Sequence, residues 1–306
     1  MIKQFKLILA SILVFSMLNG CKKTETVAAD NTELATHADD QARMSLESDA
    51  VANDANIAVD GYGSFNGKVE NLTGVICDAI TSLDSSNGLR RITINYNGQN
   101  CNGTRTRSGI VVLSMPLAAR WKDAGAVLTI EIKNLKITRV VDGKSITLNG
   151  TEDITNVSGG KLRDLASMGP ITHSILSTNM SITFDDGTAR VWQIAKKRVF
   201  SYSNGIVVTT TGTHNDGTTT GISEWGSNRF GKEFVTAITE PLIIRQDCNF
   251  RLTSGQVTHL RLQATVVVSF GLDAQGNSIS CPTGVYYFKS VWTGTNGTVR
   301  TFIIPY

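Results

Sequence analysis

Hydrophobic and polar residues alternate along most of the chain from about residue 62 to the C-terminus. The longest such run places apolar side chains at every second position on one face, namely Leu260, Leu262, Ala264, Val266, Val268 and Phe270. His259 and Arg261 begin the opposite, polar face. A period of two indicates a half-buried antiparallel strand. The pattern therefore predicts one long strand here, with His259 exposed to solvent.

Two further runs show the same period. Leu128, Ile130 and Ile132 share one face, and the alternation then changes phase at Asn134. A shift of one residue turns the following side chains to the other face, so a β-bulge is expected near Asn134. Met180, Ile182 and Phe184 form another apolar face.

Turn residues support the same fold class. Eleven Asn-Gly or Asp-Gly dipeptides lie between residues 60 and 297. Such pairs tolerate the two consecutive positive φ angles of a type I′ hairpin turn. The pairs flanked by alternating runs are the strongest candidates: Asp142-Gly143, Asp186-Gly187, Asp216-Gly217 and Asn296-Gly297.

We therefore expect an all-β fold for residues 58–306, a large antiparallel sheet or sandwich-type domain with many hairpins. About 245 residues can form one such domain or two sub-domains. Residues 159–172 interrupt the alternation and are the best border between two sub-domains. Lys161–Ser167 is the one short helical candidate within the domain.

Residues 22–57 have a different composition. They contain no aromatic residue and are rich in Ala, Asp, Glu, Asn and Thr. Such a segment offers little apolar surface to offset the entropy lost on ordering, which predicts a tether over residues 21–57. Ala42, Leu46 and Ala50 recur every fourth residue, so the tether is expected to contain a helix over residues 39–55.

The N-terminus has the features of a lipoprotein signal peptide over residues 1–20. Lys3 and Lys6 precede an apolar run, Leu7–Leu18, that is too short to span a bilayer. Gly20 then precedes Cys21, as in the bacterial lipobox, in which the cysteine is acylated. The sequence predicts lipidation of Cys21 and anchoring to the outer membrane of the cell envelope, with the periplasmic and surface faces both open.

Charge argues against a nucleic-acid partner. The formal net charge is +3, and it falls by two when Lys3 and Lys6 leave with the signal peptide. A nearly neutral domain lacks the concentrated basic face that nucleic acid requires. The one basic cluster, Lys196–Arg198, is interpreted as a solvated stretch at a bulge. The partners expected are the membrane itself and a glycan or another component of the envelope.

Four cysteines remain once Cys21 carries lipid. In an exported protein they indicate two disulfides, for which three connectivities exist. We favour the pairs that are local in sequence, Cys77 with Cys101 and Cys248 with Cys281. A zinc site is disfavoured because the chain has no CxxC or HxxxH spacing.

Several segments resemble uncharacterised lipoproteins of Bacteroidota. The resemblance rests on the lipobox and on Trp121–Ala126, Thr211–Gly217 and Arg245–Cys248, and it covers most of the chain. That family has no established activity to carry over. The resemblance therefore implies an outer-membrane lipoprotein and nothing about chemistry.

The sequence shows no catalytic, cofactor or metal motif. His214 lies beside Asp216, yet turns favour Asn, Asp and Gly for backbone reasons alone. A glycosidase needs two close carboxylates, and the sequence does not choose among its many acidic residues. Core packing is favoured for four aromatic residues that could otherwise stack on a sugar ring: Trp225, Tyr286, Tyr287 and Trp292.

Two hypotheses follow for function. The leading one is a non-enzymatic, membrane-anchored β module with a structural or ligand-binding role and no cofactor. The alternative is a glycan-directed hydrolase or a carbohydrate-binding accessory protein. A deep cleft with two close carboxylates favours the hydrolase, whereas an exposed aromatic strip favours a carbohydrate-binding module.

Overall fold

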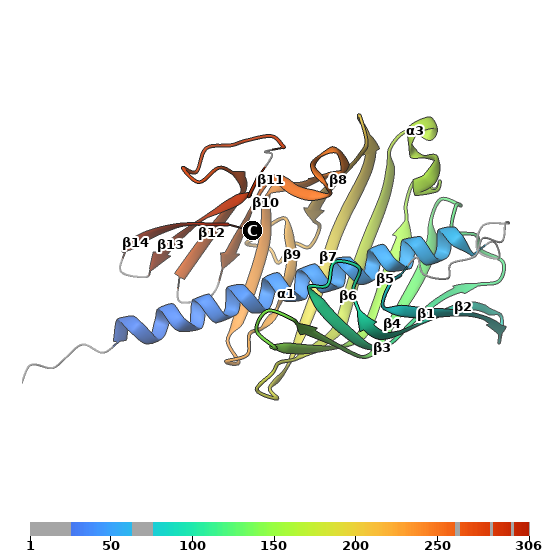
Figure 1. Ribbon diagram of the computed structural model, residues 1–306, viewed down its shortest axis with the longest axis horizontal. Helices are drawn as coiled ribbons and strands as arrows, with labels where there is room; N and C mark the ends of the chain where they lie inside the picture. The colour runs from blue at the N-terminus through green and yellow to red at the C-terminus, as the bar shows by residue number, and fades with distance from the viewer. Residues whose placement is uncertain (1–25, 63–75, 261–263, 282–283, 295–296, 306) are drawn as a thin grey trace, which may run out of the picture.

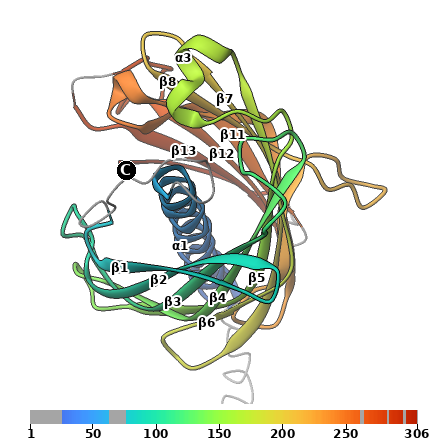
Figure 2. The ribbon, with the colours of Figure 1, turned by 90° about the vertical axis from the view of Figure 1, so that its right-hand side faces the viewer.

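A long helix lies along the concave face of one large, curved antiparallel sheet (Figures 1 and 2). The computed structural model describes residues 26–62, 76–260, 264–281, 284–294 and 297–305. The helix, α1, spans Thr26–Gly61. Seen along α1 in Figure 2, the sheet curves around the helix as an open arc. The molecule thus has two layers, a sheet and the helix inside it.

The sheet has fourteen strands, and nearly all neighbours in space are neighbours in sequence. The exception lies between β7 and β10. Two short strands, β8 and β9, each pair with both of these long strands there, at different points along their length. The strands are β1 (Ala79–Ser86), β2 (Leu89–Gln99), β3 (Arg105–Pro116), β4 (Ala126–Arg139), β5 (Ser145–Asn156), β6 (Ile171–Thr183), β7 (Ala189–Tyr202), β8 (Ile206–Gly212), β9 (Ile222–Ser227), β10 (Glu233–Arg245), β11 (Arg251–Leu260), β12 (Ala264–Leu272), β13 (Tyr287–Gly294) and β14 (Val299–Pro305).

The predicted all-β class, antiparallel pairing and abundance of hairpins are confirmed. The interruption at residues 159–172 is not a border between two sheets, because β5 and β6 on either side of it are hydrogen-bonded neighbours. Within it, a short 3-10 helix (Leu162–Asp164) and α3 (Leu165–Met168) confirm the helical candidate Lys161–Ser167.

The tether prediction for residues 21–57 was wrong where the structure describes that segment. Helix α1 extends beyond the expected 39–55 in both directions and packs in the main core. Its inward stripe includes Val51, Ala55 and Ala58, which are inaccessible or nearly so. Small side chains let the helix approach the sheet closely, so apolar bulk comes mainly from the strands.

Polar residues of α1 are buried because the sheet supplies partners for them. The Asp40 carboxylate receives two hydrogen bonds from Arg229, at 2.7 and 2.6 Å. At the other end of the helix, the Arg107 guanidinium donates to Asp54 at 2.8 Å and to both oxygens of Asp78. Composition alone did not reveal these pairs, since each joins residues far apart in sequence.

The strand phases were predicted with mixed success. Asn134 has a φ of 50° at a register shift between Ile132 and Leu135, which confirms the bulge. Met180, Ile182 and Phe184 are buried together in the main core, as expected. The run from 259 to 270 is instead a hairpin, because β11 ends at Leu260 and β12 begins at Ala264.

His259 was assigned to the wrong face of its strand. It is buried beside Thr236, whose Oγ1 lies 3.1 Å from His259 Nδ1. Burial lowers the pKa of His259 to about 4. The alternation was real, but it spans two paired strands, β11 and β12, whose inward faces differ in phase.

The turns follow a different geometry from the one expected. At Asp142-Gly143, Asp186-Gly187 and Asp216-Gly217 only the glycine has a positive φ, so these are not type I′ turns. Asn296 lies outside the described residues. Asn87-Gly88 has two positive φ angles, 51° and 74°, and joins β1 directly to β2. The tight hairpin predicted from such dipeptides therefore occurs there.

Both predicted disulfides are present. Cys77 pairs with Cys101 and Cys248 with Cys281, with Cα atoms 5.3 and 5.0 Å apart. The first lies near β1, β2 and β3 at one side of the sheet. The second connects the segment after β10 to the loop before β13.

Candidate functional site

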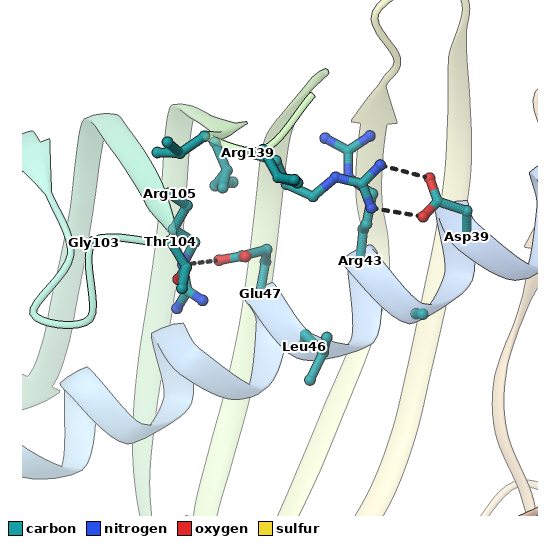
Figure 3. A pocket seen from close by; sticks show the side chains of 12 residues that line it. Asp39, Arg43, Leu46, Glu47, Gly103, Thr104, Arg105 and Arg139 are labelled. Carbon is teal, nitrogen blue, oxygen red and sulfur yellow. Dashed lines mark hydrogen bonds and ion pairs between the residues drawn. The ribbon is translucent and has the colours of Figure 1, made fainter. Parts of the chain in front are cut away.

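A hollow of about 440 Å³ lies where the middle of α1 meets β3, β4 and the loops beside them (Figure 3). Its charged lining consists of three arginines and two carboxylates, namely Arg43, Arg105, Arg139, Asp39 and Glu47. We call this hollow the arginine pocket. The arginine pocket thus presents guanidinium groups, which are donors suited to an anionic group.

Arg139 forms one wall and is fully paired. Its guanidinium donates to both oxygens of Asp39 on α1, at 2.6 and 3.2 Å. It also contacts Asp142 in the following turn, at 3.1 and 2.5 Å. These two carboxylates raise the pKa of Arg139, so it stays charged and its position is fixed.

Arg43 reaches from α1 toward the sheet beside Arg139 (Figure 3). It is almost fully buried, and its Nη2 donates to the main-chain oxygen of Lys144 at 3.0 Å. Its Nη1 has no hydrogen-bond partner among the described residues. Burial and the neighbouring Arg139 charge lower the pKa of Arg43. A buried guanidinium with an unpaired nitrogen is costly, and an anionic partner would relieve that cost.

The opposite wall combines a weaker ion pair with apolar surface. The Glu47 carboxylate lies 3.1 Å from Nε of Arg105, and burial raises the pKa of Glu47. Exposed apolar side chains of Leu46, Val140 and Val141 line the same hollow. The pocket thus offers cations inside and apolar surface at its edge, which suits an anion with an apolar part.

A buried ionic cluster lies elsewhere under α1 and corrects the interpretation of Lys196–Arg198. Lys196 and Arg198 are buried, whereas Lys197 between them is exposed. Lys196 Nζ lies 2.7 Å from Glu224 Oε1, and both basic groups contact Asp49 of α1. This cluster holds the helix to β7 and β9, so the basic run is a core feature and not a solvated stretch.

Glu152 borders that cluster from β5. Its carboxylate accepts a hydrogen bond from Ser48 at 3.2 Å. Burial raises the pKa of Glu152 to about 7, against the opposing effect of Arg198 and Lys196. This carboxyl group therefore changes protonation near neutral pH inside the helix–sheet interface.

The four aromatic residues do not form a common platform. Tyr286 is 1% exposed, and Arg251 lies over its ring. Tyr287 and Trp292 belong to β13, whereas Trp225 belongs to β9, with β10, β11 and β12 between them in the sheet. Trp225 stacks on His214 with ring centroids 4.1 Å apart. Trp292 packs against the cluster of Ile238, Val257, Val266 and Val268.

His214 and Asp216 lie where turn geometry places them. The main chain of His214 exchanges two hydrogen bonds with Ile222, both 3.0 Å long. The Asp216 carboxylate accepts main-chain hydrogen bonds from Thr218 and Thr219. These contacts fix both residues in the backbone of the turn, and the His214 ring also stacks on Trp225.

One group of metal-type ligands occurs among the described residues. Ligand atoms of Asp247, Cys248 and Cys281 lie within 4.8 Å of one another. Both sulfur atoms belong to a disulfide, so they offer no thiolate to a metal. Among the residues the structure describes, no helix is both long and apolar enough to cross a membrane. Cys21, the predicted lipidation site, lies outside the described residues.

Sequence reasoning missed the three arginines of the pocket. They come from α1, from the start of β3 and from the end of β4, so no local spacing connects them. The one available signal was the run of charged residues in a segment interpreted as solvated. Recognising that segment as a core helix was the step needed to find the pocket.

The protein is an antiparallel sheet curved around helix α1, with an arginine-lined hollow beside that helix. Comparison with protein-family models, with curated proteins and with solved structures gave no match for this chain.

Proposed function

We propose that this protein is an exported, lipid-anchored β module that binds an anionic ligand with an apolar part in the arginine pocket, and that it acts by binding and not by catalysis. The observation that carries the proposal is Arg43, a buried guanidinium with an unpaired nitrogen beside the charge of Arg139. The lipobox at Cys21 supports the membrane anchor.

The pocket's construction supports binding. Arg139 is fixed by two carboxylates, so its geometry needs no rearrangement when a ligand arrives. Arg43 provides the free donor, and charge-assisted hydrogen bonds to guanidinium are among the stronger polar contacts. Leu46 and Val141 would cover the apolar part of the ligand at the edge of the arginine pocket.

A binding experiment tests the proposal. The chain from residue 22, without lipid, is titrated calorimetrically with octyl phosphate and with octyl glucoside. We expect saturable binding of octyl phosphate that weakens as salt is added, and at least about tenfold weaker binding of the uncharged glucoside. Arg43→Gln should weaken octyl phosphate binding about tenfold or more, the scale of one charged hydrogen bond.

Arg120→Gln is the matched control, because Arg120 is exposed and lies outside the pocket. Equal octyl phosphate affinity in Arg43→Gln and Arg120→Gln would contradict the proposed site. Preferential binding of the glucoside would instead support the alternative, a carbohydrate-directed protein.

A further inference from the structure

A second hollow, of about 340 Å³, lies beside the C-terminal half of α1 and against β7, β8 and β10. Its walls are mainly apolar and include Phe200, Val208, Ile244 and Phe250. We propose that this hollow, the apolar pocket, binds a neutral amphiphile, namely an apolar chain or ring that carries one hydrogen-bond donor such as a hydroxyl group.

The donor requirement comes from Asn56, which lines the apolar pocket and is 7% exposed. Its Nδ2 donates to the main-chain oxygen of Ala52 at 3.0 Å, which fixes the orientation of the amide because only the nitrogen can donate. Its Oδ1 has no hydrogen-bond partner among the described residues. A hydroxyl or amide donor on a ligand is the group that would satisfy this acceptor.

The charge of the lining selects against an anion. Asp49 and Asp60 contribute two carboxylates, and Arg198 contributes one guanidinium that already contacts Asp49. Among the described residues of the lining, Arg198 is the one cation, and because Asp49 already engages it, a carboxylate or phosphate ligand would find no unpaired cation here. The two pockets thus favour different ligands, although the same helix lines both.

Phe250 provides independent support. Its φ is 54°, in the left-handed region that bulky residues avoid, and Asn249 before it has a φ of 59°. The ring is nevertheless 55% exposed, so its own burial does not repay the strained backbone. Strain of this kind is concentrated at ligand sites. A ligand in the apolar pocket would cover the ring.

The protein's own lipid is not the occupant. Asn56 is thirty residues beyond Thr26, a distance of about 45 Å along the helix at 1.5 Å per residue. That length exceeds the full hydrocarbon thickness of a bilayer, about 30 Å, whereas one acyl chain covers only one leaflet of it. The lipid proposed on Cys21 therefore does not reach the apolar pocket.

The test titrates the chain from residue 22 with octanol, octanoate and octyl methyl ether and measures affinity by calorimetry. We expect saturable octanol binding, with octanoate and the ether each at least about fivefold weaker. The ether keeps the apolar chain but lacks the donor. Asn56→Ala should therefore abolish the preference for octanol over the ether.

Phe250→Gly should weaken octanol binding about fivefold while leaving the melting temperature unchanged or higher, because glycine adopts a positive φ without strain. Asn249→Gly is the matched control: it relieves the neighbouring φ without removing a ring and should keep octanol affinity. Wild-type octanol affinity in Phe250→Gly, equal binding of octanoate, or no saturable octanol binding would overturn the inference. Arg43→Gln should retain octanol binding, so failure at one pocket is distinguishable from failure at the other.

Discussion

The ammonium group of Lys196 lies 2.7 Å from the Glu224 carboxylate, and both side chains are at least 96% buried beneath α1. Trp192 Nε1 donates to the other oxygen of Glu224 at 3.2 Å. Asp49 of α1 lies 3.6 Å from Lys196 Nζ. Two strands and the helix therefore meet at one buried charge pair, and removal of one member would leave the other charge without its partner.

Lys196→Met should lower the free energy of unfolding by about 3–5 kcal/mol, because it leaves the Glu224 carboxylate buried without its cation. Lys197→Met is the control: its side chain is exposed, and its effect should stay within about 0.5 kcal/mol. Urea denaturation measures both. The double variant Lys196→Met with Glu224→Leu should recover most of the stability, which would confirm that the unpaired Glu224 carboxylate is the cause. Equal stability of Lys196→Met and Lys197→Met would contradict the prediction.

Glu152 should make the protein less stable as pH rises. Its pKa is raised to about 7 in the folded state, above the ordinary glutamate value. The folded state thus holds more protons than the unfolded state between about pH 4.5 and 7, and stability falls as pH increases through that window. Glu152→Gln should be the more stable protein at about pH 8, by up to about 3 kcal/mol, with no advantage near pH 4.5.

The effect of Glu152 is measured as the difference in free energy of unfolding between Glu152→Gln and wild type at each pH. His173 and His259 have pKa values lowered to about 4, so they destabilise the fold as pH falls from about 6.5 to 4. Subtracting the wild-type pH profile from that of Glu152→Gln cancels this contribution. Glu131→Gln is the control, since its side chain is 51% exposed. A flat difference profile for Glu152→Gln would contradict the prediction.

A chain that begins at residue 58 should fail to fold cooperatively. It lacks Met44, Val51 and Ala55, which are fully or almost fully buried in the main core, and it leaves Lys196 and Arg229 without their helix partners, Asp49 and Asp40. A chain that begins at residue 22 should give one sharp thermal transition. Near-UV circular dichroism of both proteins provides the comparison. A native-like spectrum for residues 58–306 would show that α1 is dispensable.

Cys21→Ala tests the proposed anchor. The variant should lose incorporation of labelled palmitate and should no longer fractionate with membranes after a high-salt wash. Cys248→Ala is a useful contrast, because it removes a disulfide cysteine and should leave palmitate incorporation intact. Membrane fractionation of Cys21→Ala equal to wild type, together with absence of palmitate from wild type, would refute lipidation.

The sequence predicted the sheet because alternation is a local signal that survives in every strand. The bulge at Asn134 and the apolar face of Met180 and Ile182 followed directly from it. The disulfides followed from the sequence-local pairing of four cysteines. These features depend on residues that are close in the chain.

The central helix and both pockets could not be predicted in the same way. Asp40 is buried because Arg229 pairs with it, and Asp49, whose side chain is 33% exposed, contacts Arg198; no composition rule anticipates partners so distant in the sequence. His259 was misplaced because one continuous alternation in the sequence covers two paired strands, β11 and β12, whose inward faces differ in phase. Where burial depends on long-range ion pairs, a polar segment looks solvated until its partners are known.

The position of α1 at the start of the chain has a consequence for folding during synthesis. Gln41 hydrogen-bonds to Thr236, which is 195 residues later. At roughly 5–20 residues per second, the ribosome needs about 10–40 seconds to add those residues. An isolated helix is marginally stable in water, so α1 is not stably formed before the strands that contact it have been synthesised. Synthesis of β10, late in the chain, therefore sets the earliest moment at which the helix gains its full set of contacts.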